Sequence, residues 1–142
     1  MANFMEIAMQ EARDAASRDE IPVGAVVVWN NEIVARAGNR TEEFYDPTAH
    51  AEMLVLREAC DRLGAPRIPE CDLYVSLEPC TMCAAAISFA RIRRLYYGAA
   101  DPKMGGIYTF NQPSCHHKPE IYDSINATES ADLLKSFFLG KR

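Results

Sequence analysis

The sequence predicts an α/β domain whose sheet is covered by helices on both faces. Apolar residues make up 49% of the 142 residues, which is enough for a buried core, and the length suits one domain, residues 1–142. Segments with the 3.6-residue period of a helix alternate with short β-rich segments. This alternation is typical of a sheet that packs between two layers of helices.

The first part of the chain predicts a helix followed by a β-hairpin. Apolar residues recur at helical spacing over residues 3–18. Residues 21–29 and 32–38 are rich in valine, isoleucine and alanine, and Asn30-Asn31 separates them. Because asparagine tolerates left-handed backbone conformations, this pair indicates a tight turn between two neighbouring strands.

The rest of the chain predicts alternating helices and strands around one long loop. Residues 49–64 predict a helix with Thr48 as its N-cap and Gly64 as its C-terminal stop. Residues 101–119 have three prolines, two glycines and no clear period, so we expect a long loop with room for a short helix. The other expected elements are strands at 71–77, 93–100 and 119–125 and helices at 80–92 and 130–142.

Charge and hydropathy limit the class of protein. The net charge of −5 argues against a protein that coats nucleic acid without specificity. Residues 91–142 nevertheless carry eight basic against five acidic side chains, so a polyanion is expected to meet this part. The N-terminal segment lacks a signal-peptide pattern, and no stretch approaches the roughly 20 apolar residues that span a bilayer. We therefore expect a cytoplasmic protein without membrane contact.

Cys80 and Cys83 lie three residues apart in the segment SLEPCTMCAAAIS. A C-x-x-C pair at the start of a helix is typical of thioredoxin-like redox sites, and two small core residues are a second interpretation. Residues three apart on a helix also share a face, where two thiolates could bind one zinc ion. Further ligands are needed to distinguish these three interpretations.

His50 offers a third zinc ligand, because it lies at the start of the other central helix. In a three-layer fold, both helices can begin at the same edge of the sheet. Tetrahedral zinc with three protein ligands keeps one position for water, as in catalytic sites, whereas structural sites use four. We therefore expect one metal ion per chain, bound by His50, Cys80 and Cys83. Zinc suits one imidazole and two thiolates best, and iron is the alternative.

A fourth protein ligand would close this site. Cys60 lies nearly three turns along its helix, and Cys71 precedes its strand, so both are expected away from the metal. Cys115, His116 and His117 lie in the long loop, and their spacing does not exclude them.

Glu52 is a candidate proton carrier beside the metal. A step of two residues turns a helix by about 200°, so His50 and Glu52 converge only if the metal lies beyond the helix end. Glu52 would then act as a general acid and base without binding the metal. The alternative is a solvated surface glutamate.

Two motifs, HAE at 50–52 and PCTMC at 79–83, match the H-x-E…P-C-x-x-C signature of zinc nucleobase deaminases. The segments IPVGAVVV, DPTAHAE, LYVSLEPCTMCAAAI and HHKPEI…LLKSFF resemble the bacterial tRNA-specific adenosine deaminases, the TadA family. The resemblance extends from residue 4 to residue 139. It implies a cytidine-deaminase-like α/β/α fold with a five-stranded mixed sheet, a homodimer, and conversion of the wobble adenosine of a tRNA anticodon to inosine.

Several side chains are candidates for contact with the tRNA anticodon stem-loop. Asn39 follows the second strand, and the matching asparagine of the similar family contacts the target nucleoside. Phe138, next to Phe137, could stack on an anticodon base. Lys103 and His117 in the long loop are further candidates. The candidate phosphate contacts are Arg91, Arg93, Arg94, Lys103, Lys118, Lys141 and Arg142.

The expected reaction is hydrolytic, with Glu52 moving protons from water to adenine and to the departing amine. Two other functions stay open. A deaminase of a free base or nucleoside, such as guanine or cytosine, would use the same zinc chemistry. A zinc-stabilised RNA-binding module would need no turnover.

Overall fold

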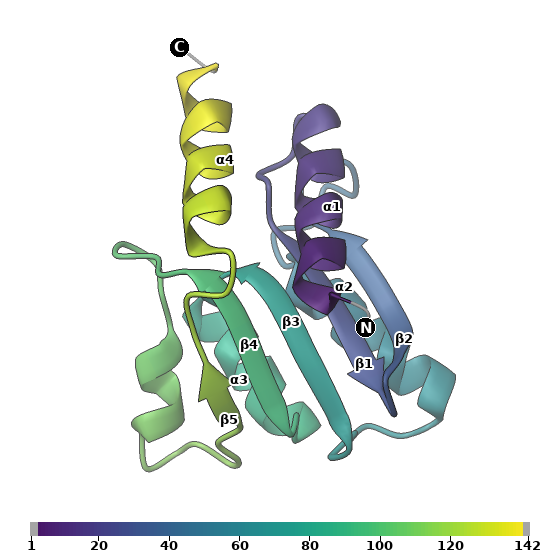
Figure 1. Cartoon of the computed structure of the whole chain (residues 1–142). Coiled ribbons are helices and arrows are strands. Elements are labelled where there is room, and N and C mark those ends of the chain that lie inside the picture. The colour runs from purple at the N-terminus through teal and green to yellow at the C-terminus, as the bar shows by residue number, and fades with distance from the viewer. Residues whose placement is uncertain (1–2, 141–142) are drawn as a thin grey trace.

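Five strands form one mixed sheet in the order β2-β1-β3-β4-β5 in the computed structural model, which describes residues 3–140 (Figure 1). β1 pairs antiparallel with β2 and with β3, whereas β3 pairs parallel with β4 and β4 with β5. β2, β3, β4 and β5 therefore share one direction. The strands are β1 (Gly24–Trp29), β2 (Glu32–Gly38), β3 (Cys71–Leu77), β4 (Arg94–Ala99) and β5 (Glu120–Tyr122).

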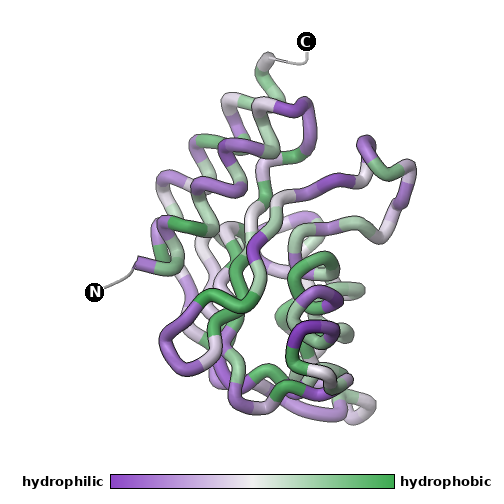
Figure 2. The backbone as a smooth tube through the Cα atoms, turned by 90° about the vertical axis from the view of Figure 1, so that its right-hand side faces the viewer, coloured by the Kyte–Doolittle hydropathy of each residue, from purple (hydrophilic) through white to green (hydrophobic). Residues whose placement is uncertain are grey.

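Helices cover both faces of this sheet. α1 (Phe4–Ser17) and α4 (Ala127–Leu139) lie on one face, and α2 (Ala51–Leu63) and α3 (Thr81–Ala90) lie on the other (Figure 1 and Figure 2). This arrangement confirms the predicted α/β/α fold with a five-stranded mixed sheet. Within residues 3–140, no helix has the length and apolar character that crossing a membrane requires.

The hydrophobic core has two parts, one on each face of the sheet. Val27 belongs to the larger part, together with Val55 of α2 and Ile87 of α3, and all three are fully buried. Val26 and Val28 belong to the smaller part beneath α1. Because successive side chains of a strand point to opposite faces, the valines of β1 serve both parts in turn.

The start of α2 differs from the predicted start. Thr48 is not the N-cap, because its hydroxyl donates a hydrogen bond to Asp46 Oδ1 at 2.7 Å. His50 takes the N-cap position instead, and the helix begins at Ala51. The prediction of Thr48 as the cap is therefore wrong, and the correction places His50 at the open end of the helix.

The C-terminal elements also differ in length. The long loop contains the short 3₁₀-helix η1 (Ile107–Asn111), and the strand expected at 119–125 is reduced to the three residues of β5. The last helix begins at Ala127, three residues earlier than expected. Its expected end at residues 141 and 142 lies outside the described residues, as do the candidate phosphate contacts there.

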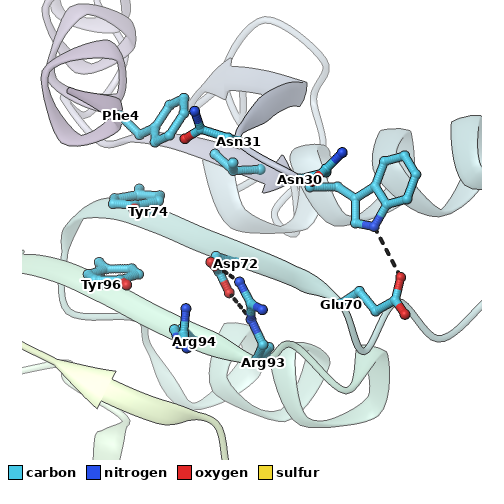
Figure 3. Close-up of a pocket in the computed structure, with 11 residues that line it drawn as sticks. Phe4, Asn30, Asn31, Glu70, Asp72, Tyr74, Arg93, Arg94 and Tyr96 are labelled. Atoms are coloured by element: carbon cyan, nitrogen blue, oxygen red, sulfur yellow. Dashed lines mark hydrogen bonds and ion pairs between the residues drawn. The ribbon is translucent and has the colours of Figure 1, made fainter. Parts of the chain in front are cut away.

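A shallow groove lies on the sheet at the N-terminal ends of β3 and β4 (Figure 3). Tyr74 and Tyr96 stack there with ring centroids 4.3 Å apart, and Arg93 forms two hydrogen bonds with Asp72, at 2.9 and 2.8 Å. Arg94 forms an ion pair with a carboxylate of β5 at 3.2 Å. These two candidate phosphate contacts are therefore paired with carboxylates, at the edge of the sheet where β3 and β4 begin.

Candidate active site

The sheet topology brings the starts of α2 and α3 to one edge. β2 leads into α2 through residues 39–50, and β3 leads into α3 through residues 78–80. Because β2 and β3 run in the same direction, both helices begin where these strands end. His50 is the N-cap residue of α2, and Cys80 is the N-cap residue of α3. Two residues that are distant in the chain are thus brought together.

The side chains of His50, Cys80 and Cys83 form a compact cluster. His50 Nδ1 lies 3.6 Å from Cys80 Sγ and 3.5 Å from Cys83 Sγ, and the three ligand atoms lie within 4.8 Å of one another. Zinc bonds of about 2.0 Å to nitrogen and about 2.3 Å to sulfur place the two atoms about 3.5 Å apart in a tetrahedron. The cluster therefore has the spacing and the donor set of a zinc site.

Hydrogen bonds within the cluster shift the pKa values of its side chains. The hydrogen bond with Cys83 lowers the pKa of the Cys80 thiol to about 4. The same contact raises the pKa of Cys83, and a hydrogen bond with Cys80 raises the pKa of His50. The positive end of the α3 dipole further favours a thiolate at Cys80. The lowered pKa favours the thiolate form of Cys80, which is the form that binds a divalent cation.

The other cysteines and histidines lie away from this cluster. Among residues 3–140, no other group of three or more His, Cys, Asp or Glu side chains lies close enough together to hold a metal ion. His117 lies beside the C-terminal end of α3, with Nε2 2.9 Å from the Ile92 carbonyl oxygen. Cys115 Sγ lies at the same end, 3.4 Å from Ser88 Oγ. The cluster therefore offers three protein ligands.

Glu52 is buried beside the cluster, in the first turn of α2. Its side chain is 4% exposed, and this burial raises the pKa of its carboxyl to about 7. The nearby His50 and Cys83 side chains act on this pKa in the opposite direction, with smaller effects. The alternative of a solvated surface glutamate therefore does not hold. A carboxyl with a pKa near neutrality can accept and donate protons at physiological pH, as general acid–base catalysis requires.

Asn39 lies just after β2, at the edge of the sheet where the cluster lies. It is 5% exposed, and its Nδ2 donates to Thr41 Oγ1 at 3.2 Å and to Glu20 Oε1 at 3.4 Å. The Glu20 carboxylate also accepts hydrogen bonds from the backbone N–H groups of Glu42 and Glu43. Because a carboxylate can only accept, Glu20 fixes the amide so that Asn39 Oδ1 is left to accept from another group.

Lys103 and Phe138 line one pocket of about 590 Å³. This pocket lies where β3 and β4 end, and therefore at the same edge of the sheet as the cluster of His50, Cys80 and Cys83. Phe138 is 51% exposed, and its ring meets the Phe137 ring edge-on. His117 does not line this pocket, since it lies at the far end of α3. The pocket residues are Ile21, Leu77, Ala99, Ala100, Asp101, Pro102, Lys103, Met104, Ala131, Leu134 and Phe138.

Two glutamates that the sequence does not single out also shape this edge. Glu20 holds Asn39 and the loop that follows it. Glu78 accepts hydrogen bonds from the backbone of the loop after β4. Neither residue has a local sequence signal, because their partners lie roughly 20 to 30 residues away in the chain and are chosen by the tertiary fold.

Comparison with known proteins establishes the family. Residues 1–99 match the family described as the cytidine and deoxycytidylate deaminase zinc-binding region. A tRNA-specific adenosine deaminase of Agrobacterium fabrum is 59% identical, over 99% of this chain and 95% of the relative. The chain belongs to the tRNA-specific adenosine deaminase family. A second member of this family, from Bacillus subtilis, is 41% identical over 95% of this chain and 86% of the relative.

Solved structures show the fold of this deaminase family and of a related one. A structure from work on A-to-I editing by tRNA:A34 deaminases at the wobble position of transfer RNA matches with a TM-score of 0.90 and 60% identity, over 92% of this chain and 98% of that chain. A guanine deaminase from Bacillus subtilis matches with a TM-score of 0.68 and 30% identity, over 98% of this chain and 95% of that chain. The same fold thus serves deaminases of different substrates.

Proposed function

We propose that this protein converts the wobble adenosine of a tRNA anticodon to inosine, with one zinc ion per chain bound by His50, Cys80 and Cys83. The observation that carries the proposal is the three-ligand cluster with buried Glu52 at its side. Three ligands suit a catalytic zinc site better than a structural one. The tRNA substrate is supported by the 59% identity to a relative named for that activity.

When bound at such a site, a zinc ion would supply Lewis acidity and would lower the pKa of a bound water toward ~7. His50 Nδ1 and the sulfur atoms of Cys80 and Cys83 would hold the ion at the edge of the sheet where α2 and α3 begin. Because Cys83 is fully buried in the first turn of α3, its sulfur is fixed by the helix and not by a mobile loop.

Glu52 carries the protons of the reaction. Its carboxylate accepts one proton from the attacking water and delivers it to N1 of adenine, which makes C6 electrophilic. After the water oxygen has added to C6, Glu52 transfers the second water proton to the amino group. The C6–N bond then breaks and ammonia leaves. One adenosine and one water thus give one inosine and one ammonia.

Four side chains are proposed to hold the tRNA. Asn39 accepts a hydrogen bond from the target nucleoside through Oδ1, because Glu20 and Thr41 engage its amide nitrogen. Phe138 stacks on a neighbouring base, and Lys103 pairs with a phosphate from the wall of the same pocket. His117 would meet RNA that extends along α3, beyond the pocket.

Inosine sequencing tests this function most directly. The purified zinc-loaded protein is incubated with an anticodon stem-loop that has adenosine at the wobble position, and separately with guanine, cytosine and adenosine. We expect inosine at the wobble position and ammonia from the stem-loop alone. Ammonia from a free base, without inosine in the stem-loop, would overturn the tRNA assignment.

Guanine deamination is the second candidate, because a guanine deaminase is 30% identical over nearly the whole chain. The guanine arm of the same experiment decides between the two substrates. A zinc-stabilised RNA-binding module is disfavoured by the burial of Glu52 beside the cluster. Tight binding of the stem-loop without ammonia release in any arm would favour that module.

The cellular setting and the oligomeric state complete the proposal. All five cysteines are free thiols, which suits a reducing compartment such as the cytoplasm. Phe89 of α3 and Tyr108 of η1 are 58% and 57% exposed on the face that carries α2 and α3. Large exposed aromatic side chains are typical of a protein interface, and this face is the proposed surface of a homodimer.

A further inference from the structure

Glu78 connects two segments: the Pro79–Cys80 turn, here called the metal-ligand turn, and the loop after β4. That loop forms one wall of the pocket that Lys103 and Phe138 line, which is the proposed substrate pocket. The Glu78 backbone N–H donates to the Ala99 carbonyl at 2.9 Å, which holds the end of β3 against the end of β4. Its carboxylate extends under the following loop. Oε1 accepts from the Asp101 N–H at 3.1 Å, and Oε2 accepts from the Ile107 N–H at 3.2 Å. One side chain thus holds both ends of the segment 101–107.

The glycines inside this segment show how closely it packs. A Cβ on Gly105 would overlap the Glu78 carboxylate itself. A Cβ on Gly106 would lie 2.5 Å from the Cys80 carbonyl carbon, which is too close for two nonbonded carbons. The Gly106 N–H donates to the Pro79 carbonyl at 2.7 Å. The segment therefore rests directly on the backbone that presents the Cys80 sulfur.

The same segment carries pocket residues on its outer side. Asp101 Oδ1 accepts the backbone N–H groups of Lys103 and Met104, at 3.1 and 3.0 Å, which closes a tight turn. Both of these side chains line the pocket that contains Phe138. The inner side of the segment therefore contacts the metal-ligand turn, while its outer side forms the wall of the pocket.

We propose that Glu78 is a positioning residue that sets the spacing between the metal ligands and the substrate pocket. It does so by holding segment 101–107 against the Pro79–Cys80 turn. Hydrogen bonds from backbone N–H groups to a carboxylate are about twice as strong as neutral ones, so this contact suits a rigid support. The effect on the pocket rests on the proposed function, whereas the effect on the segment and on the metal does not.

The test compares Glu78→Ala and Glu78→Gln with the control Glu70→Ala, which changes a glutamate at the opposite end of β3. Amide hydrogen exchange at residues 101–107 is expected to be at least tenfold faster in Glu78→Ala, with the β3 amides unchanged. Zinc affinity, measured with a competing chelator, is expected to fall about 10- to 100-fold, as for other residues that support metal ligands. Glu78→Gln keeps one acceptor oxygen, so its exchange rates at residues 101–107 and its zinc affinity should lie between those of wild type and Glu78→Ala.

A third readout is the KM for the anticodon stem-loop, which is expected to rise about tenfold while kcat changes less than about threefold. Faster exchange with unchanged zinc affinity and KM would show that Glu78 serves only the fold and would overturn the proposal. Unchanged exchange at residues 101–107 in Glu78→Ala would show that the Glu78 carboxylate does not hold this segment. If wild type does not deaminate, the proposed function fails, and exchange and zinc affinity still decide the role of Glu78.

Gly106→Ala tests the same contact from its other side. The added methyl group meets the Cys80 carbonyl and the Thr81 N–H, so it should loosen the segment in the same way as Glu78→Ala. Faster exchange and weaker zinc binding are expected. A Gly106→Ala protein with wild-type zinc affinity would contradict the tight packing. If this variant does not fold, the nearly isosteric Glu78→Gln decides the question.

Discussion

At the scale of single residues, burial separates glutamates that share one helix. Glu52 lies in the first turn of α2, is 4% exposed and lies beside the cluster of His50, Cys80 and Cys83. Glu58 lies on the same helix, is 40% exposed and forms a surface ion pair with Arg62 at 2.8 Å. Surface ion pairs contribute little to stability, whereas a buried carboxyl with a raised pKa is suited to proton transfer.

Replacement of Glu52 is expected to separate metal binding from turnover. Glu52→Ala should keep its zinc, because Glu52 is not among the three ligands, and should lose about 10²- to 10⁴-fold in kcat, the usual contribution of a general acid–base group. Zinc is measured by elemental analysis and turnover by ammonia release. Glu58→Ala is the control and should retain wild-type values. Wild-type kcat in a zinc-loaded Glu52→Ala protein would remove Glu52 from this role.

Replacement of Lys103 is expected to change the salt dependence of tRNA use. If Lys103 pairs with a phosphate, Lys103→Ala should lower the slope of log KM against log salt by about 0.7, the value for one phosphate contact on a single strand. Arg62→Ala removes the same charge from the far end of α2 and should leave the slope unchanged. Equal slopes for wild type and Lys103→Ala would exclude a phosphate contact.

The residues of the cluster were predictable because their motifs are local and specific to one chemistry. His50, Glu52, Cys80 and Cys83 occur at the spacings of the H-x-E…P-C-x-x-C signature of zinc nucleobase deaminases. Glu20 was not predictable, because its partners follow β2 and meet it only after the hairpin has folded. The sequence patterns thus predict the candidate reacting groups but not the side chains that hold them in place.

At the scale of elements, the periodic segments were predictable and their ends were not. The run of alanines and methionines in α1 gives a clear helical period, and α1 spans Phe4–Ser17 close to the predicted 3–18. The start of α2 differs from the prediction because of Thr48. Its hydroxyl donates a hydrogen bond to Asp46 Oδ1 and does not cap the first turn of the helix. Such a choice is made by a local loop conformation that the helical period does not report.

The packing of α1 on β1 is expected to depend on the absence of a side chain at Gly24. A Cβ there would lie 2.5 Å from the Ala12 nitrogen and would also meet the Ala8 carbonyl. Gly24→Ala should therefore lower the free energy of unfolding by about 1–3 kcal/mol, the usual cost of overpacking. Urea unfolding of the zinc-loaded protein measures this loss.

Gly140→Ala is the matched control for Gly24→Ala. Among the described residues, the nearest atom to a Cβ at Gly140, apart from its chain neighbours, would be the Phe137 carbonyl oxygen at 3.5 Å. Gly140 has a φ of −68°, which alanine adopts without strain. Its free energy of unfolding should stay within about 0.5 kcal/mol of wild type, as for most surface substitutions. Equal losses in the two variants would contradict the tight contact between α1 and β1.

At the scale of the whole molecule, strand direction determines which residues meet. β1 runs against its two neighbours, so the ends of β2 and β3 lie at the same edge and bring His50 to Cys80. The sequence predicts five strands but does not order them, because strand order depends on long-range pairing. The same topology places His117 at the far end of α3, which its position in a loop could not reveal.

Association of two copies through the face that carries α2 and α3 is expected to depend on Phe89. Phe89→Glu places a charge on an apolar surface, so it should convert a dimer to monomers with little change in zinc content. Sedimentation velocity measures the oligomeric state. Ile33→Glu, on the edge strand β2, is the control for an exposed apolar residue elsewhere and should leave the dimer intact. A Phe89→Glu dimer as stable as wild type would exclude this surface.

The most direct measurement of the central claim is X-ray absorption at the zinc edge of the loaded protein. We expect two sulfur atoms at about 2.3 Å and two nitrogen or oxygen atoms at about 2.0–2.1 Å, of which one is an imidazole nitrogen. The same spectrum is expected for Glu52→Ala, because that residue does not bind the metal. Three sulfur atoms, or two imidazoles beside two sulfurs, would show a closed structural site and would contradict the deaminase mechanism.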